Sequence, residues 1–182
     1  DLHFPVPADV FQCALGIPVS SDDTPALYML LWRTLTDIGL SPYAAKNAYQ
    51  RERPFMVREE TTCTPQDEEA LRKDGSYPSG HTAVGWGWAL ILTELAPERA
   101  EALLARGRAF GESRNVCNAH WYSDVVAGRM TGAAAVAKLH SNNEFKAAMQ
   151  SAREDIARAR EQGLEPTVDC EAEAEALATP LL

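Results

Sequence analysis

The chain has 182 residues, of which 46% are hydrophobic and 24% charged, and this balance is typical of one globular domain with a buried core. Its net charge of −9 would repel nucleic acid and anionic membrane surfaces at long range. The most apolar window, residues 83–95, contains Glu94 and is shorter than the roughly 20 residues that a membrane-spanning helix requires. We therefore expect a soluble protein that binds neither nucleic acid nor membrane.

Three Thr-Pro or Ser-Pro pairs mark the starts of helices in the first part of the chain. A Thr-Pro pair at residue 24 supplies an N-cap and a first-turn proline, and apolar residues then recur at helical spacing up to residue 40. A Ser-Pro pair at residue 41 opens a second helix, which must end before Pro54 because proline breaks a helix interior. A Thr-Pro pair at residue 64 opens a third, short helix.

Longer helical patterns follow in the middle of the chain. Residues 81–95, 97–116 and 121–140 each carry small and aliphatic residues at helical spacing, and we predict that they form the core. A more charged helix is predicted for residues 145–160, with Gly163 as its stop. Strand alternation is not convincing anywhere, so the sequence favours an all-α helical bundle.

The domain organisation follows from these patterns. We expect a single helical domain over residues 1–163. Residues 164–182 are acidic and rich in alanine, and we expect this tail to be mostly disordered and anchored at Cys170.

Three short stretches carry residue types that handle phosphate. They read K-N-A-Y-Q-R-E-R-P at residues 46–54, P-S-G-H at 78–81 and S-R-N-V-C-N-A-H-W-Y-S-D at 113–124. Their order and spacing resemble the tripartite signature of the type 2 phosphatidic acid phosphatase superfamily, and every fixed position of that signature is filled. The context G-S-Y-P-S-G-H-T at residues 75–82 is most similar to the class A bacterial non-specific acid phosphatases. The resemblance extends over residues 24–140.

That resemblance implies a helical bundle of the acid phosphatase and vanadium-dependent haloperoxidase type, without the membrane helices of the related lipid phosphatases. Class A members carry further helices ahead of the part that residues 1–19 would match. We therefore expect that these helices were trimmed or are supplied by another fragment or subunit. Members are often homo-oligomers, and we expect the same of this protein.

Three cations are expected to hold a phosphoryl group. Lys46 and Arg53 are seven residues apart, which is two helical turns, so we expect both on one helix face. Arg114 comes from another helix, and converging cations are costly unless an anion lies among them. The resemblance implies this role for all three, and it implies that the Ser79 hydroxyl and the Gly80 N–H bind further oxygens at a helix start. For each basic residue alone, the alternative is a solvated helix face.

Two histidines are the expected catalytic groups. His120 and Asp124 are four residues apart, so the carboxylate can accept the proton of one imidazole nitrogen. The other nitrogen then carries a free lone pair, and the resemblance implies that His120 attacks phosphorus to form a phosphohistidine. His81 would protonate the leaving oxygen and later activate water, which requires one neutral and one charged histidine and predicts an acid pH optimum. The alternatives are a merely structural His-Asp pair and Ser79 as nucleophile, which lacks a G-x-S-x-G elbow.

No metal and no cofactor are expected. The chain has no H-E-x-x-H motif and no D-x-D cluster, and cations beside the two motif histidines would repel a divalent ion. The same cradle should accept vanadate, a phosphate mimic, as an inhibitor.

The four cysteines, Cys13, Cys63, Cys117 and Cys170, form no C-x-x-C motif. Two disulfides are the favoured interpretation, and they imply a periplasmic or secreted protein. Of the three possible connectivities we favour Cys63 with Cys117, because both lie close to motif residues, which leaves Cys13 with Cys170. The alternative is four buried free thiols in a cytosolic protein.

Together these features predict a metal-independent acid phosphatase that hydrolyses a broad range of small phosphomonoesters and releases inorganic phosphate. A vanadium-dependent haloperoxidase would use the same oxyanion cradle and is the first alternative. The second is a phosphate-binding bundle without catalysis, which is disfavoured because mere anion binding needs neither His81 nor His120.

Overall fold

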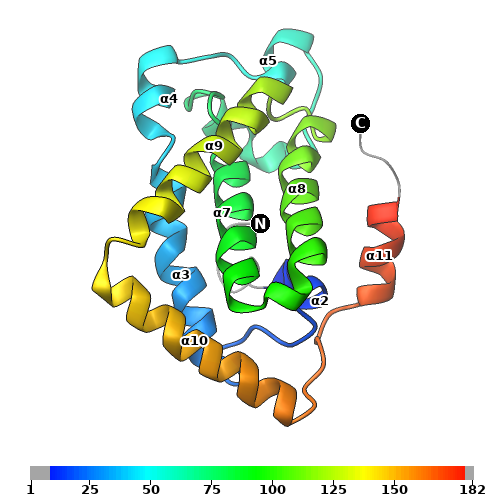
Figure 1. The fold of residues 1–182 in the computed structure, drawn as a ribbon. Helices are drawn as coiled ribbons and strands as arrows, with labels where there is room; N and C mark the ends of the chain where they lie inside the picture. The colour runs from blue at the N-terminus through cyan, green and yellow to red at the C-terminus, as the bar shows by residue number, and fades with distance from the viewer. Residues whose placement is uncertain (1–8, 179–182) are drawn as a thin grey trace.

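The computed structural model describes residues 9–178, and within this part of the chain every regular element is a helix (Figure 1). In chain order the elements are α2 (Gln12–Leu15), α3 (Pro25–Leu40), α4 (Tyr43–Tyr49), α5 (Pro54–Arg58), η1 (Pro65–Asp67), α6 (Glu68–Leu71), α7 (Gly80–Leu95), η2 (Pro97–Arg99), α8 (Ala100–Val116), α9 (Tyr122–Leu139), α10 (Asn143–Glu161) and α11 (Cys170–Ala178). The all-α prediction is confirmed. None of the described helices is long and apolar enough to cross a membrane.

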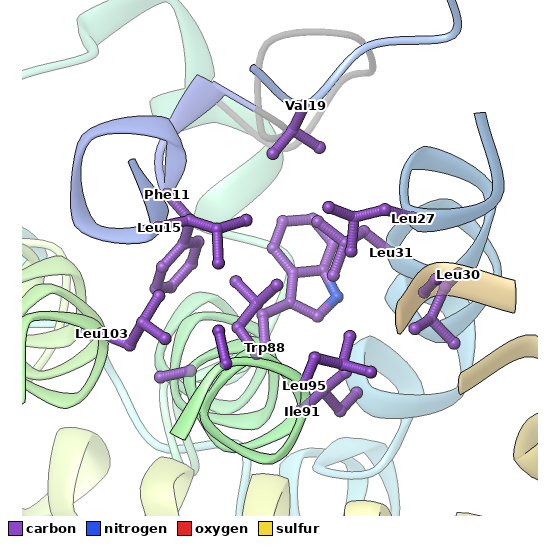
Figure 2. Packing of buried hydrophobic residues seen from close by; sticks show 14 of the residues in the cluster. Phe11, Leu15, Val19, Leu27, Leu30, Leu31, Trp88, Ile91, Leu95 and Leu103 are labelled. Carbon is purple, nitrogen blue, oxygen red and sulfur yellow. The ribbon is translucent and has the colours of Figure 1, made fainter. Parts of the chain in front are cut away.

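Helix α7 lies at the centre of the molecule and packs against α3, α8 and α9 (Figure 1). It carries Trp88, which is 1% exposed and whose indole N–H donates to Thr34 Oγ1 of α3 at 3.1 Å. Figure 2 shows the indole between Leu27 and Leu31 of α3 on one side and Leu15 of α2 on the other. Because these side chains leave water together, the core joins the short α2 to the long helices.

Two glycines allow α8 and α9 to approach the first turn of α7. A Cβ on Gly128 of α9 would lie 2.6 Å from the carbonyl oxygen of Ser79, and one on Gly111 of α8 would lie 2.7 Å from Thr82 Cγ2. Any side chain would clash at these distances, so the close approach requires glycine. The Ser79 N–H also donates to the Asp124 carbonyl at 3.0 Å. The starts of α7 and α9 and the end of α8 therefore meet at one end of the bundle.

The long helices agree with the sequence prediction, and so does the short helix that opens at the Thr-Pro pair of residue 64, where η1 and α6 lie. Helices α3, α7, α8, α9 and α10 fall within one to three residues of the predicted stretches. The second predicted helix ends before Pro54 as expected, but already at Tyr49, and α5 begins at Pro54 as an element that was not predicted. Helices α2 and α5 are too short to show a helical period, which needs two or more turns to be recognised.

The expectation that the tail after residue 163 is mostly disordered is wrong for its described part. Helix α11 forms there, and Glu173 pairs with Arg106 of α8 at 3.1 Å. Asp169 Oδ1 accepts the N–H groups of Glu171 and Ala172, and acidic residues in the first turn suit the helix dipole. Residues 179–182 lie outside the described part.

Both disulfides have the connectivity that the sequence analysis favours. Cys63 pairs with Cys117, and Cys13 pairs with Cys170. The Cys13–Cys170 disulfide joins α2 to α11, and Gln12 Oε1 of α2 also accepts the backbone N–H of Thr167 at 2.9 Å. The start of the tail is thus fixed to α2 of the helical domain.

Candidate active site

The three sequence motifs meet around one cavity of about 440 Å³. Polar residues from all three motifs line it, and Asp74 joins them: Lys46, Arg53, Asp74, Gly80, His81 and His120. The remaining lining residues are mostly apolar: Leu35, Thr36, Gly39, Leu40, Tyr43, Leu71 and Val84. Both motif histidines therefore face the same space.

Lys46 and Arg53 reach this cavity from two different elements, which corrects the expectation of one helix face. Lys46 lies in α4, whereas Arg53 precedes α5 in an extended conformation with φ −82° and ψ 153°. The residue before a proline avoids the helical region, so Pro54 forces this break. Gln50, with φ 44°, ends α4 in the left-handed region.

Asp74 was missed in the sequence and lies between these two cations. Its Oδ2 accepts hydrogen bonds from Lys46 Nζ at 2.8 Å and from Arg53 Nη2 at 3.1 Å. Only its position four residues before the P-S-G-H motif could have drawn attention to it.

His120 is held with one imidazole nitrogen as an acceptor. Arg53 Nη1 lies 3.1 Å from His120 Nε2 and also donates to the Ala119 carbonyl at 3.1 Å. A guanidinium can only donate, so Nε2 must present its lone pair and the proton of the neutral ring must reside on Nδ1. The nitrogen expected to act as nucleophile is thus the one that faces the cations.

Asp124 faces the other nitrogen of His120. Its Oδ2 lies 3.4 Å from His120 Nδ1, which is long for a hydrogen bond, and accepts the Trp121 N–H at 2.9 Å. Its Oδ1 accepts from Arg51 Nη1 at 2.7 Å, a contact that the sequence analysis missed although Arg51 lies within the first motif. The spacing of four residues spans the start of α9, because Trp121 is the N-cap of that helix.

Ser79 and Gly80 form the first turn of α7. Ser79 is the N-cap, and its Oγ accepts from the Thr82 N–H at 3.3 Å and the Thr82 Oγ1 at 2.9 Å. With both bonds accepted, the Ser79 hydroxyl proton is free to be donated to a ligand. Gly80 lines the cavity at the positive end of a 16-residue helix, a setting that favours an anion.

Arg114 occupies the last turn of α8 and is buried. Its carbonyl accepts the N–H groups of Ala119 and His120 at 3.0 and 3.1 Å, so the loop that carries the histidine folds back over the helix end. Its side-chain Nε has no hydrogen-bond acceptor among residues 9–178. Arg114 does not line the cavity itself, but its charge adds to burial in lowering the pKa of Arg53 and of His81, two residues that do.

Burial lowers the pKa of His81 and of His120 to about 3. The positive charges of Arg114 and Arg53 add to this effect at His81. At His120 the charge of Arg53 adds to it, while the Asp124 carboxylate opposes it. Both imidazoles are therefore neutral at neutral pH, and a bound anion would raise both pKa values.

The charges around the cavity suit an oxyanion. Lys46 and Arg53 on the cavity wall and Arg114 near it supply three positive charges, against the carboxylate of Asp74 on the wall and that of Asp124, whose charge also acts on Lys46 and Arg53. Within the described part of the chain, no three His, Cys, Asp or Glu side chains gather as a metal site would require. The donor set fits phosphate or vanadate, which accept hydrogen bonds through several oxygens.

Comparison with known proteins gives a consistent picture. A family profile described as PAP2 superfamily matches residues 25–146. Among curated relatives, the non-specific acid phosphatase of Providencia stuartii is 44% identical over 152 residues, 83% of this chain and 61% of the relative. The acid phosphatase of Zymomonas mobilis subsp. mobilis is 43% identical over 164 residues, 88% of this chain and 61% of the relative.

A third relative, the non-specific acid phosphatase of Salmonella typhimurium, is 45% identical over 150 residues, 82% of this chain and 60% of the relative. The chain thus spans about three fifths of the length of these relatives. The family match includes all three motifs and every polar residue of the cavity wall. The chain belongs to the PAP2 superfamily.

Proposed function

We propose that the protein is an acid phosphatase that hydrolyses small phosphomonoesters. The observation that carries this proposal is the cavity in which a neutral imidazole, with its Nε2 lone pair held by Arg53, faces a cluster of cations and a second histidine. Three relatives with 43–45% identity are named acid phosphatases, which supports the same reaction. Because the cations supply the charge stabilisation that phosphoryl transfer needs, we propose that no metal takes part.

In the proposed mechanism, Lys46, Arg53, Arg114, the Ser79 hydroxyl and the Gly80 N–H bind the non-bridging oxygens of the phosphoryl group. Arg53 Nη1 then transfers its hydrogen bond from His120 to a phosphoryl oxygen, which frees the Nε2 lone pair. This exchange couples substrate binding to release of the nucleophile.

The chemistry takes two steps. His120 Nε2 attacks phosphorus, the bond to the ester oxygen breaks, and His81 gives its proton to the departing alkoxide. Water then attacks the phosphohistidine while neutral His81 takes its proton, the P–N bond breaks, and phosphate leaves with His120 neutral again. Asp124 keeps the proton of His120 on Nδ1 throughout, across a separation of 3.4 Å.

Substrate binding raises the pKa of His81, so that this histidine can carry the proton that the first step requires. We expected one charged histidine, yet the pKa of His81 is lowered to about 3 by burial and by the charges of Arg114 and Arg53. The negative phosphoryl group offsets those positive charges and raises this pKa. An anion in the cage thus favours protonation of His81, and with it activity in the acid range.

A broad substrate range follows from the rest of the cavity wall. Beyond the cation cage the lining is mostly apolar, with Leu35, Leu40, Tyr43 and Val84. Such a surface offers contact area to many leaving groups and few hydrogen bonds that would select one. The two disulfides support a periplasmic or secreted location, and a homo-oligomeric state is proposed from the family resemblance alone.

The decisive test is hydrolysis of p-nitrophenyl phosphate at acid pH by the protein and by His120→Ala. Removal of the nucleophile should lower kcat by roughly a thousandfold or more, since catalysis through a covalent intermediate loses its first step. Equal rates in both proteins would remove His120 from the mechanism. Bromide oxidation with peroxide and vanadate, without ester hydrolysis, would favour the haloperoxidase instead.

A further inference from the structure

The Asp74 carboxylate joins the two buried cations of the cage. Its Oδ2 is the common acceptor for Lys46 Nζ at 2.8 Å and Arg53 Nη2 at 3.1 Å. The side chains of the two cations are 3% and 2% exposed, whereas that of Asp74 is 33% exposed and faces the cavity. Two like charges this deeply buried repel each other, and a carboxylate between them offsets that cost.

The backbone around Asp74 binds the same two side chains. Arg53 Nε donates to the carbonyls of Leu71 at 2.9 Å and Asp74 at 3.1 Å, and Lys46 Nζ donates to the Gly75 carbonyl. Arg53 has five guanidinium N–H groups, and Lys46 has three ammonium N–H groups. The contacts above, together with those from Arg53 to Ala119 and His120, use all but one N–H group on each side chain. The one that remains on each side chain has no acceptor among the described residues.

We propose that Asp74 is a positioning residue, which holds Lys46 and Arg53 in place and aims their remaining N–H groups at the phosphoryl oxygens of the substrate. The inference rests on the proposed phosphatase function and deepens it. Donors that are already aimed need not reorganise when charge develops in the transition state, which is the main source of catalysis in a loose phosphoryl transfer. Asp74 acts through the two cations and does not touch the reacting atoms.

The same carboxylate opposes the loss of charge on Lys46. Burial and the charge of Arg53 lower the pKa of Lys46, whereas Asp74 and the more distant Asp124 raise it. The other charged or titratable groups around this cage are Arg114, the phenol of Tyr43, whose ring centroid lies 5.8 Å from Lys46 Nζ, and the histidines at positions 81 and 120, which are neutral at neutral pH. Loss of the Asp74 charge should therefore lower the pKa of Lys46 and weaken its hold on an anion above neutral pH.

The variant Asp74→Asn removes the charge and keeps the shape. For p-nitrophenyl phosphate we expect kcat to fall about 10- to 100-fold, because small misplacements of catalytic groups have effects of this size. We expect KM to change much less, since misaimed donors affect the transition state more than the ground state. The control Glu69→Gln removes a carboxylate from the exposed Glu69–Lys73 pair of the adjoining helix, at 2.9 Å with 87% and 74% exposure, and should leave both constants unchanged.

A second readout does not depend on activity. The chain has four lysines, so the Nζ resonance of Lys46 can be followed by NMR as a function of pH. In Asp74→Asn its pKa should fall by about one unit or more, as expected on losing an adjacent opposite charge, while Lys73, Lys138 and Lys146 stay unchanged. If Asp74 only stabilised the fold, Asp74→Asn would lower the amount of folded protein but would leave the pKa of Lys46 and the kcat of the folded fraction unchanged.

The outcomes separate the two proposals. A kcat for Asp74→Asn within twofold of that of the original protein would overturn the positioning role, because Asp74 would then have no part in catalysis. A higher kcat would overturn it as well, because Asp74 would then compete with phosphate for the two cations. An unchanged pKa of Lys46 would overturn it as well. If the original protein hydrolyses no phosphomonoester, the proposed function fails, whereas the lysine titration still decides what Asp74 does. Should Asp74→Asn not fold, Asp74→Glu keeps the charge and displaces the oxygen, and an undiminished kcat there would refute the inference.

Discussion

Asp124 is fully buried and yet retains a lowered pKa, because its oxygens accept hydrogen bonds that offset the cost of burial. The Trp121 N–H at 2.9 Å and Arg51 Nη1 at 2.7 Å donate to them, and His120 Nδ1 lies 3.4 Å away. Burial alone would raise the pKa of this carboxyl, whereas contacts with His120, the Trp121 N–H and Ser76 lower it. A charged acceptor facing Nδ1 keeps the proton there and leaves Nε2 unprotonated.

Asp124→Asn should therefore lower kcat by roughly 100-fold or more, since an amide can turn its NH2 group toward Nδ1 and force the opposite tautomer. In the unchanged protein, the acid limb of kcat/KM should lie near pH 3, because neutral His120 is required and its pKa is lowered to about 3. Asp124 raises that pKa, so in the variant this limb moves to still lower pH. A pH–rate profile of both proteins measures these effects.

Asp37→Asn is the matched control, because Asp37 is an exposed carboxylate on α3 that does not line the cavity. Its profile should coincide with that of the unchanged protein. An acid limb near pH 6.5 in the unchanged protein would contradict the lowered pKa of His120.

At the scale of elements, the site depends on how closely α9 approaches the first turn of α7. Gly128→Ala would place a Cβ 2.6 Å from the Ser79 carbonyl oxygen and 2.9 Å from Thr82 Cβ. The helices must separate to admit it, which should destabilise the fold by about 1–3 kcal/mol. Because Ser79 and Asp124 bridge these two helices, kcat should fall as well. Urea unfolding and turnover measure the two effects.

Gly39→Ala in α3 provides the contrasting case. A Cβ there would lie 3.6 Å from Val84 Cγ2, which is an ordinary contact. The free energy of unfolding should stay the same or rise by up to about 1 kcal/mol, since alanine favours a helix over glycine. Equal destabilisation by both substitutions would argue against the packing explanation.

For the whole molecule, the two disulfides serve different parts of the chain. Cys13–Cys170 closes a loop of 157 residues between the start and the end of the described chain, far from the motifs in sequence. Cys63–Cys117 closes 54 residues, and Cys117 lies three residues before His120. Removal of either bond should lower the free energy of unfolding by about 2–5 kcal/mol.

The effect on kcat should distinguish the two disulfides. The double variant Cys13→Ser with Cys170→Ser should keep the kcat of its folded fraction, whereas Cys63→Ser with Cys117→Ser should lower it, because the loop that carries His120 loses its anchor. Urea unfolding together with p-nitrophenyl phosphate hydrolysis makes the comparison. A lower kcat in the first variant alone would reverse this assignment.

Helical periodicity alone was sufficient for the long helices, because each must bury a continuous apolar stripe and so repeats it every three to four residues. It could not reveal the break between α4 and α5, where two residues expected on one helix reach the same cavity from separate elements. Nor could it predict α11, whose order depends on a disulfide and on a contact with Arg106. Charge and alanine content by themselves do not distinguish a disordered tail from a tethered helix.

The sequence by itself identified the candidate groups: two histidines, an aspartate, three cations and a helix start, in the order of the three motifs. Only the tertiary structure decided their state. Asp74 lies 28 residues from Lys46 and joins it through space, and burial together with nearby cations lowers the pKa of both histidines to about 3. Desolvation and Coulomb interactions depend on distance in the folded molecule, which residue spacing along the chain does not contain.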